Sequence, residues 1–120
     1  MVTVVKYGIL EIFSGDSHGM VTVWWTKTGK ILQQCKAHTG KVTDLQFDAT
    51  KIISCGMDHV IQIIDVMSGS LLLTLRGHQG SVLGISFDIH QVLSFSNEGK
   101  LRIWKLSKST DAAQSCESNK

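Results

Sequence analysis

The chain has 120 residues, of which 42% are hydrophobic, and its formal net charge at pH 7 is +2. This composition is typical of a folded globular protein and argues against a disordered one. Lysines and arginines are spread along the chain, so the charge does not predict a nucleic-acid-binding or membrane-binding surface. The apolar runs are also shorter than the roughly 20 residues that a membrane-spanning helix needs.

The N-terminal stretch MVTVVKYGILEIF is apolar, but Lys6 and Glu11 interrupt it, and no basic leader or small-residue cleavage site accompanies it. We therefore interpret it as part of the fold and not as a signal peptide. Cys35, Cys55 and Cys116 are odd in number and widely spaced, which is typical of free thiols in a reducing compartment. These features predict a cytoplasmic protein, with the nucleus as the alternative, that is not secreted.

The sequence repeats with a period of 40 residues. Residues 76–106 align without a gap on residues 36–66, and the same frame extends back to the beginning of the chain. Corresponding positions include Ser14, Ser54 and Ser94, and also Phe47 and Phe87. A fixed period of this length indicates a repeat architecture.

Each repeat contains short runs rich in Val, Ile, Leu and Phe, separated by turn residues. In the second repeat the predicted strands are residues 42–47, 51–55, 60–66 and 71–75. Such runs favour strands over helices, and four of them joined by tight turns form an antiparallel meander. The third run is apolar on both faces, which predicts that neighbouring sheets cover each sheet on both sides.

The third repeat supplies three predicted strands, at residues 82–87, 91–95 and 100–106. Residues 107–120 are polar and lack the alternation of a strand, so we expect a flexible C-terminal tail there. The expected fold is all-β with eleven strands, in repeats at about residues 1–40, 41–80 and 81–106. Its last strand, 100–106, would be an unpaired edge.

A repeat of this length with Gly-His near one end and Trp-Asp near the other resembles the WD40 family. Gly77-His78 and Ala37-His38 stand at the Gly-His position, and Trp24-Trp25, Ile64-Asp65 and Trp104-Lys105 stand at the Trp-Asp position. The resemblance covers residues 1–106 and implies a β-propeller with one four-stranded blade per repeat. About 2.75 blades would form an incomplete ring, because propellers close with about 4–8 blades.

The resemblance also implies a buried chain of hydrogen bonds within each blade, running from His through Asp and Ser to Trp. By position, the third repeat supplies His78, Glu98, Ser94 and Trp104, the second supplies His38, Asp58 and Ser54, and the first supplies Ser14 and Trp24. Ile64 takes the tryptophan position of the second repeat and cannot donate a hydrogen bond. His18 takes the acidic position of the first repeat. We therefore expect degenerate networks, of which the second ends at Ser54.

Several residues could also suggest chemistry. His38, Ser54 and Asp58 are the residue types of a hydrolase triad, but Ser54 lies within an apolar strand and not on an exposed elbow. Cys35 and His38 lack the second pair that a zinc site needs. Thr28-Gly29-Lys30 lacks the upstream glycine of a phosphate-binding loop. We expect no catalysis, no metal and no cofactor.

The family resemblance implies instead a non-catalytic scaffold or adaptor that binds other proteins through loops at one end of the blades. The candidate loop residues are Ser17, Thr39, Met57, His59, Gln79 and Asn97. Met57 is the most informative, because an apolar residue in a tight turn does not serve solubility. Trp25 is either an exposed binding aromatic or a filler between blades, and both alternatives stay open.

Three blades in an open stack would expose apolar outer faces. We therefore expect the chain to be a fragment or short isoform of a larger WD40 protein, or to associate with further blades or with itself. The alternative function is a nucleic-acid-associated propeller subunit that binds through scattered Lys and Arg. Membrane association is not expected.

Overall fold

The computed structural model describes residues 1–8, 10–88, 90–106 and 113–119, the last of these through their backbone. The first sheet contains β1 (Val2–Tyr7), β2 (Glu11–Asp16), β3 (Met20–Trp25) and β4 (Ile31–Lys36). The second sheet contains β5 (Val42–Phe47), β6 (Lys51–Gly56), β7 (Val60–Asp65) and β8 (Leu71–Arg76). The third sheet contains β9 (Val82–Phe87), β10 (Gln91–Ser96), β11 (Lys100–Leu106) and β12 (Ala113–Asn119).

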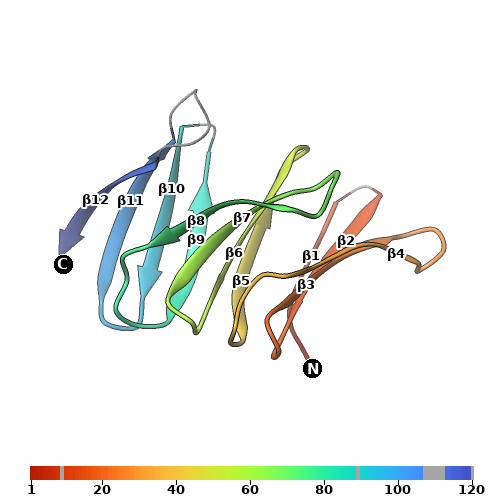
Figure 1. Ribbon diagram of the computed structural model, residues 1–120, viewed down its shortest axis with the longest axis horizontal. Helices are drawn as coiled ribbons and strands as arrows, with labels where there is room; N and C mark the ends of the chain where they lie inside the picture. Colours follow the sequence, from red (N-terminus) through yellow and green to blue (C-terminus); the bar gives the residue numbers. More distant parts are fainter. Residues whose placement is uncertain (9, 89, 107–112, 120) are drawn as a thin grey trace.

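Each sheet is an antiparallel meander in which strands that follow one another in the sequence are hydrogen-bonded neighbours. The three sheets lie in a row, with the first sheet at the right of Figure 1 and the third at the left. The first strand of each sheet contacts the preceding sheet. β5 contacts β1 and β2, and β9 contacts β5 and β6. Among the described strands, none pairs the first sheet with the third, so the row is open.

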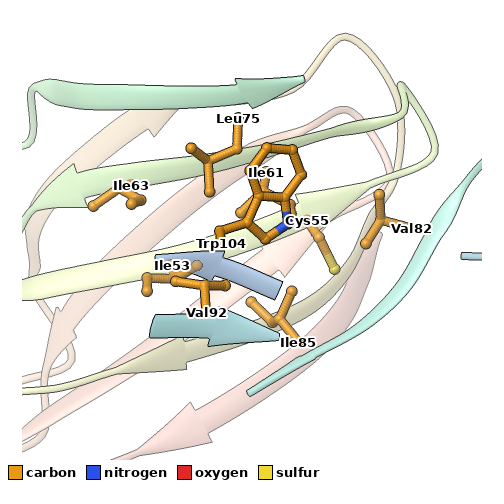
Figure 2. Packing of buried hydrophobic residues seen from close by; sticks show 9 residues of the cluster. All are labelled: Ile53, Cys55, Ile61, Ile63, Leu75, Val82, Ile85, Val92 and Trp104. Atoms are coloured by element: carbon orange, nitrogen blue, oxygen red, sulfur yellow. The ribbon is translucent and has the colours of Figure 1, made fainter. Parts of the chain in front are cut away.

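The hydrophobic core lies between the sheets. The first cluster joins the first and second sheets and contains Phe13, Val21, Val23, Ala37, Val42, Leu45, Ile52 and Ile64. The second cluster joins the second and third sheets and contains the nine side chains drawn in Figure 2: Ile53, Cys55, Ile61, Ile63, Leu75, Val82, Ile85, Val92 and Trp104. The second sheet is therefore covered on both faces, as the apolar run over β7 predicted.

Hydrogen bonds between sheets follow the same repeat. The hydroxyl of Thr3 donates to the carbonyl oxygen of Val42 at 2.6 Å, and the hydroxyl of Thr43 donates to the carbonyl oxygen of Val82. At the second junction the carboxylate of Asp44 also accepts from the backbone N–H of Ile85 at 3.1 Å. The two junctions are thus built from corresponding strands and corresponding apolar positions.

The predicted all-β fold of antiparallel four-stranded sheets is confirmed, and the bounds of β5, β9 and β11 agree with the prediction. The expected flexible tail needs a correction. Residues 113–119 form β12, which pairs with β11 from Lys100↔Asn119 to Leu106↔Ala113. Main-chain hydrogen bonds hold such an outer strand irrespective of its polar sequence, so the edge of β11 is paired. The rest of the expected tail, 107–112 and 120, lies outside the described residues.

Candidate functional site

The second sheet contains a three-residue polar network. His38 lies in the loop before β5, Ser54 lies on β6, and Asp58 lies in the turn between β6 and β7. Nδ1 of His38 is 2.9 Å from Oδ1 of Asp58, and Nε2 is 2.9 Å from Oγ of Ser54. Asp58 also accepts from the backbone N–H of Thr39 at 3.0 Å. The network therefore ties the loop before β5 to the adjacent turn and to the sheet.

Burial determines the charge state of this network. Burial lowers the pKa of His38, and the carboxylate of Asp58 only partly opposes this effect. The imidazole is therefore neutral at pH 7. A carboxylate can only accept, so Nδ1 of His38 carries the proton and donates to Asp58, which leaves Nε2 to accept from the hydroxyl of Ser54.

The distances resemble those of a catalytic Ser-His-Asp triad, but the access does not. Ser54 and His38 are both buried. A nucleophile must reach its substrate beside an oxyanion hole, and a hydroxyl closed inside a sheet cannot do so. The arrangement supports an interpretation of His38, Ser54 and Asp58 as residues that hold the fold together.

The third sheet forms a network with a different carboxylate contact. Ser94 joins Nε2 of His78 at 2.6 Å to the indole N–H of Trp104, which donates to its hydroxyl at 2.8 Å. Oε1 of Glu98 is 3.8 Å from Nδ1 of His78, which is longer than a hydrogen bond. Glu98 instead accepts from the backbone N–H of Gln79 at 2.9 Å, and this bond lowers the pKa of Glu98.

The first sheet retains the shortest version. The indole N–H of Trp24 donates to the hydroxyl of Ser14 at 2.9 Å. The side chain of His18 is exposed, and the backbone N–H groups of His18 and Met20 donate to Asp16 at 2.9 and 3.0 Å. Asp16, which the repeat frame did not indicate, thus supplies the carboxylate of this turn. The sequence signal was Asp at the start of a four-residue turn that ends in Gly19.

Sequence reasoning also missed a buried amide. Gln62 lies in the middle of β7, where its Nε2 donates to the carbonyl oxygen of Ala37 at 2.8 Å and its Oε1 accepts from the hydroxyl of Thr74 at 2.5 Å. These bonds connect β7 to the loop that carries His38 and to β8. A glutamine within the apolar run VIQIID was the available signal, since a buried polar side chain needs partners.

All six candidate loop residues lie at one end of the sheets, which we call the network end. It consists of the turns 17–19, 57–59 and 97–99 and the loops 37–41 and 77–81, and it lies at the lower side of Figure 1, near the N-terminus. The turns are fixed in the same way, because the backbone N–H groups of Ser17, Met57 and Asn97 donate to the carbonyl oxygens of Met1, Lys41 and Ser81. Ser17 is half-buried, and Thr39, Met57, His59, Gln79 and Asn97 are exposed.

The central turn of the network end differs from its two copies. The side chain of Met57 is 50% exposed, whereas the corresponding positions hold the polar residues Ser17 and Asn97. His59 has a left-handed backbone with a φ of 74°, whereas the corresponding positions hold Gly19 and Gly99 at 88° and 81°. A side chain in this conformation costs roughly 1–2 kcal/mol. The turn therefore combines an exposed apolar side chain at Met57 with a strained backbone at His59.

Trp25 is half-buried at the opposite end of its sheet, so it does not belong to the network end. Cys35 and Cys55 are free thiols, and burial raises the pKa of Cys55 to about 12. Among the described residues, no three His, Cys, Asp or Glu side chains converge in a way that could hold a metal ion. The described part of the chain has no helix with the length and apolar character needed to cross a membrane.

The protein-family model described as "WD domain, G-beta repeat" matches residues 29–65 and 69–105 of the chain. The first match contains β4 and then β5 to β7, and the second contains β8 and then β9 to β11. Each matched unit thus runs from the outer strand of one sheet into the next sheet. The matches together cover more than half of the chain.

Among curated proteins, the chain is similar to Eukaryotic translation initiation factor 3 subunit I of Bombyx mori, at 33% identity over 71 residues. This alignment covers 56% of the chain but spans only 22% of that protein. Among solved structures, it is similar to the computationally designed Ika4 protein, with a TM-score of 0.83 and 29% identity over 88% of the chain and 66% of Ika4. It is also similar to the designed Ika8 protein, with a TM-score of 0.84 and 25% identity over 96% of the chain and 36% of Ika8.

Proposed function

Because the chain belongs to the WD40 repeat family, we propose that it is a non-catalytic scaffold whose network end binds a partner protein. The observation that carries this proposal is the turn 57–59. It has an exposed Met57 and a left-handed His59, where the corresponding turns 17–19 and 97–99 have a polar residue and a glycine. Backbone strain of this kind clusters at active sites and ligand-binding sites.

The polar network beneath the turn supports a binding role. Asp58, between Met57 and His59, is held by His38 and by the backbone of Thr39. The turn and the neighbouring loop are therefore fixed before any partner arrives, which reduces the entropy lost on binding. We expect a partner surface with an apolar side chain opposite Met57 and a hydrogen-bonding group opposite His59.

The similarity to a curated protein supports a role within a protein complex. The name of the curated relative identifies it as a subunit of a translation initiation factor. By analogy we expect the present chain to act within a protein complex, although it spans about a fifth of that relative. The nucleic-acid alternative has less support, because Lys36 donates to the carbonyl oxygen of His18 and Lys51 pairs with Asp48 at 2.8 Å.

A Met57→Ser substitution tests the proposal. Serine is the residue of the corresponding turn at Ser17, so the fold should tolerate it. Tagged wild-type and variant chains are compared by affinity purification with mass spectrometry, and the affinity of each recovered partner is then measured by calorimetry. Losing one buried apolar contact should weaken binding about tenfold.

The matched control is Met67→Ser, which removes an exposed methionine from the opposite end of the second sheet. This control should bind partners as the wild type does. Equal affinity of the Met57 variant and the wild type for every partner would show that the network end is not the binding surface.

A further inference from the structure

One apolar face recurs on all three sheets. We call it the front face, and it is the face by which the second sheet packs on the first and the third packs on the second. In the second sheet it consists of Val42, Leu45, Phe47, Ile52 and Ile64, and in the third of Val82, Ile85, Phe87, Val92 and Trp104. The corresponding residues of the first sheet are Val2, Val5, Tyr7, Ile12 and Trp24. They are uncovered to differing extents, with Val5 54% and Tyr7 79% exposed.

The opposite side of each sheet, the back face, recurs in the same way. Phe13, Val21 and Val23 of the first sheet pack on the second, and Ile53, Ile61 and Ile63 of the second sheet pack on the third. The corresponding residues of the third sheet are Leu93, Leu101 and Ile103. Phe95, beside them on β10, is 44% exposed. The chain therefore presents a front face on one side of the row and a back face on the other.

We propose that the front face of the first sheet docks on the back face of the third sheet of a second copy of this chain. The chain contains this contact twice. The first cluster forms it between the first and second sheets, and the second cluster, drawn in Figure 2, forms it between the second and third sheets. Head-to-tail contacts of this type close into a ring when the rotation permits. Two copies contribute six sheets, which lies within the about 4–8 blades that close a propeller.

The internal junctions indicate which residues meet between copies. The rings of Phe13 and Phe47 stack at the first junction with centroids 4.1 Å apart, and Ile53 and Phe87 hold the same positions at the second. The repeat therefore places Leu93 of one copy against Tyr7 of the other. In the same way Gly15 lies against Val42, so Phe95 of one copy would lie against Val2 of the other.

The junction between copies differs from the internal ones in two respects. Leu83 stands where Thr3 and Thr43 donate hydrogen bonds across the internal junctions. Phe95 is also larger than Gly15 and Cys55 at the corresponding positions, so this part of the junction must be wider. We therefore expect the copies to associate reversibly, with weaker contacts than those inside the chain.

The two faces also explain why the occupant is a second copy. Both are made of uncharged, mostly apolar side chains, and each already has its complementary face elsewhere on the same chain. They lie along the flat sides of the end sheets, whereas the turn at Met57 lies at the network end. Self-association is thus independent of the proposed partner binding.

Analytical ultracentrifugation of the full chain tests the inference. With rising concentration, the mass should increase from 13.2 kDa to twice that value. Val5→Glu on the front face and Phe95→Glu on the back face should each keep the chain monomeric over the same range. The matched control is Leu72→Glu on β8, which changes a residue that is 58% exposed and lies off both faces. This control should dimerise, and circular dichroism should show that all three variants are folded.

A mixing experiment tests the head-to-tail geometry itself. Val2→Glu and Phe95→Lys should each be monomeric alone. In an equimolar mixture they should form dimers, because one junction then pairs Glu with Lys and the other is wild type. The proposal is overturned by a wild-type monomer at every concentration, by polymers larger than two copies, by equal dimerisation of Val5→Glu and Leu72→Glu, or by no recovery in the mixture.

Discussion

His38 and His78 hold the same position in successive sheets but face carboxylates of different length. Both carboxylates accept from the backbone of the loop before the first strand of their sheet, but Asp58 also reaches Nδ1 of His38 at 2.9 Å, whereas Glu98 stays 3.8 Å from Nδ1 of His78. The repeat frame predicted which residues would meet. The frame could not predict where the longer side chain of Glu98 would turn, because that depends on the turn geometry.

The lowered pKa of His38 predicts a pH dependence of stability. Burial keeps the imidazole neutral in the folded chain, while the unfolded chain takes up a proton below the ordinary pKa of 6.5. The unfolded state then binds more protons, so the free energy of unfolding falls as the pH drops below 6.5 and continues to fall until the folded pKa is reached. The slope is at most about 1.4 kcal/mol per pH unit for one group.

Urea unfolding at about pH 7.5 and about pH 5.5 measures this loss. The non-titrating variant His38→Gln should show a smaller difference between the two pH values. The variant His18→Gln, at an exposed position, should retain the wild-type difference. An unchanged difference in His38→Gln would contradict the assignment.

At the scale of elements, the turns between second and third strands were predictable and the last strand was not. The 40-residue frame and the turn residues placed these turns correctly, and the structure shows a left-handed backbone at the corresponding positions Gly19, His59 and Gly99. β12 was missed because its residues 113–119 show no apolar alternation. An outer strand is held by hydrogen bonds to the main chain of its neighbour. Its side chains therefore need not alternate between apolar and polar, and the sequence pattern does not indicate the strand.

The strain at His59 predicts that His59→Gly stabilises the chain. The substitution removes the left-handed penalty of roughly 1–2 kcal/mol and adds backbone entropy to the unfolded state, so the free energy of unfolding should rise by about 0.5–1 kcal/mol. Urea unfolding measures the change. The reverse substitution, Gly99→His in the third sheet, should lower the free energy of unfolding by about the same amount. A destabilised His59→Gly variant would show that the imidazole makes a structural contact that outweighs the strain.

At the scale of the whole molecule, the sequence predicted that the sheets stack but not how they lock together. The apolar character of both faces of β7 required a neighbour on each side. The hydrogen bonds of Thr3 and Thr43 across the junctions could not be read from the pattern, because a threonine on a strand can equally face water. An apolar core and a threonine hydrogen bond therefore occur together at both junctions between sheets.

Thr43→Val tests the contribution of one such bond. Valine keeps the shape of threonine but removes the hydroxyl that donates to the carbonyl oxygen of Val82. The free energy of unfolding should fall by about 1 kcal/mol, the usual net value of one hydrogen bond. Thermal and urea unfolding measure the change. Thr39→Val, at an exposed loop position, should leave the stability unaltered, and an equal loss in both variants would argue against a role for the inter-sheet bond.

The order of strands within each sheet has a consequence for synthesis on the ribosome. Every sheet is made of consecutive strands, so β4 completes the first sheet before β5 has been translated. Pairing between neighbours in sequence is fast, and chains fold from the N-terminal part as they emerge. We expect the nascent chain to add one finished sheet after another, each ready to receive the next as it leaves the exit tunnel.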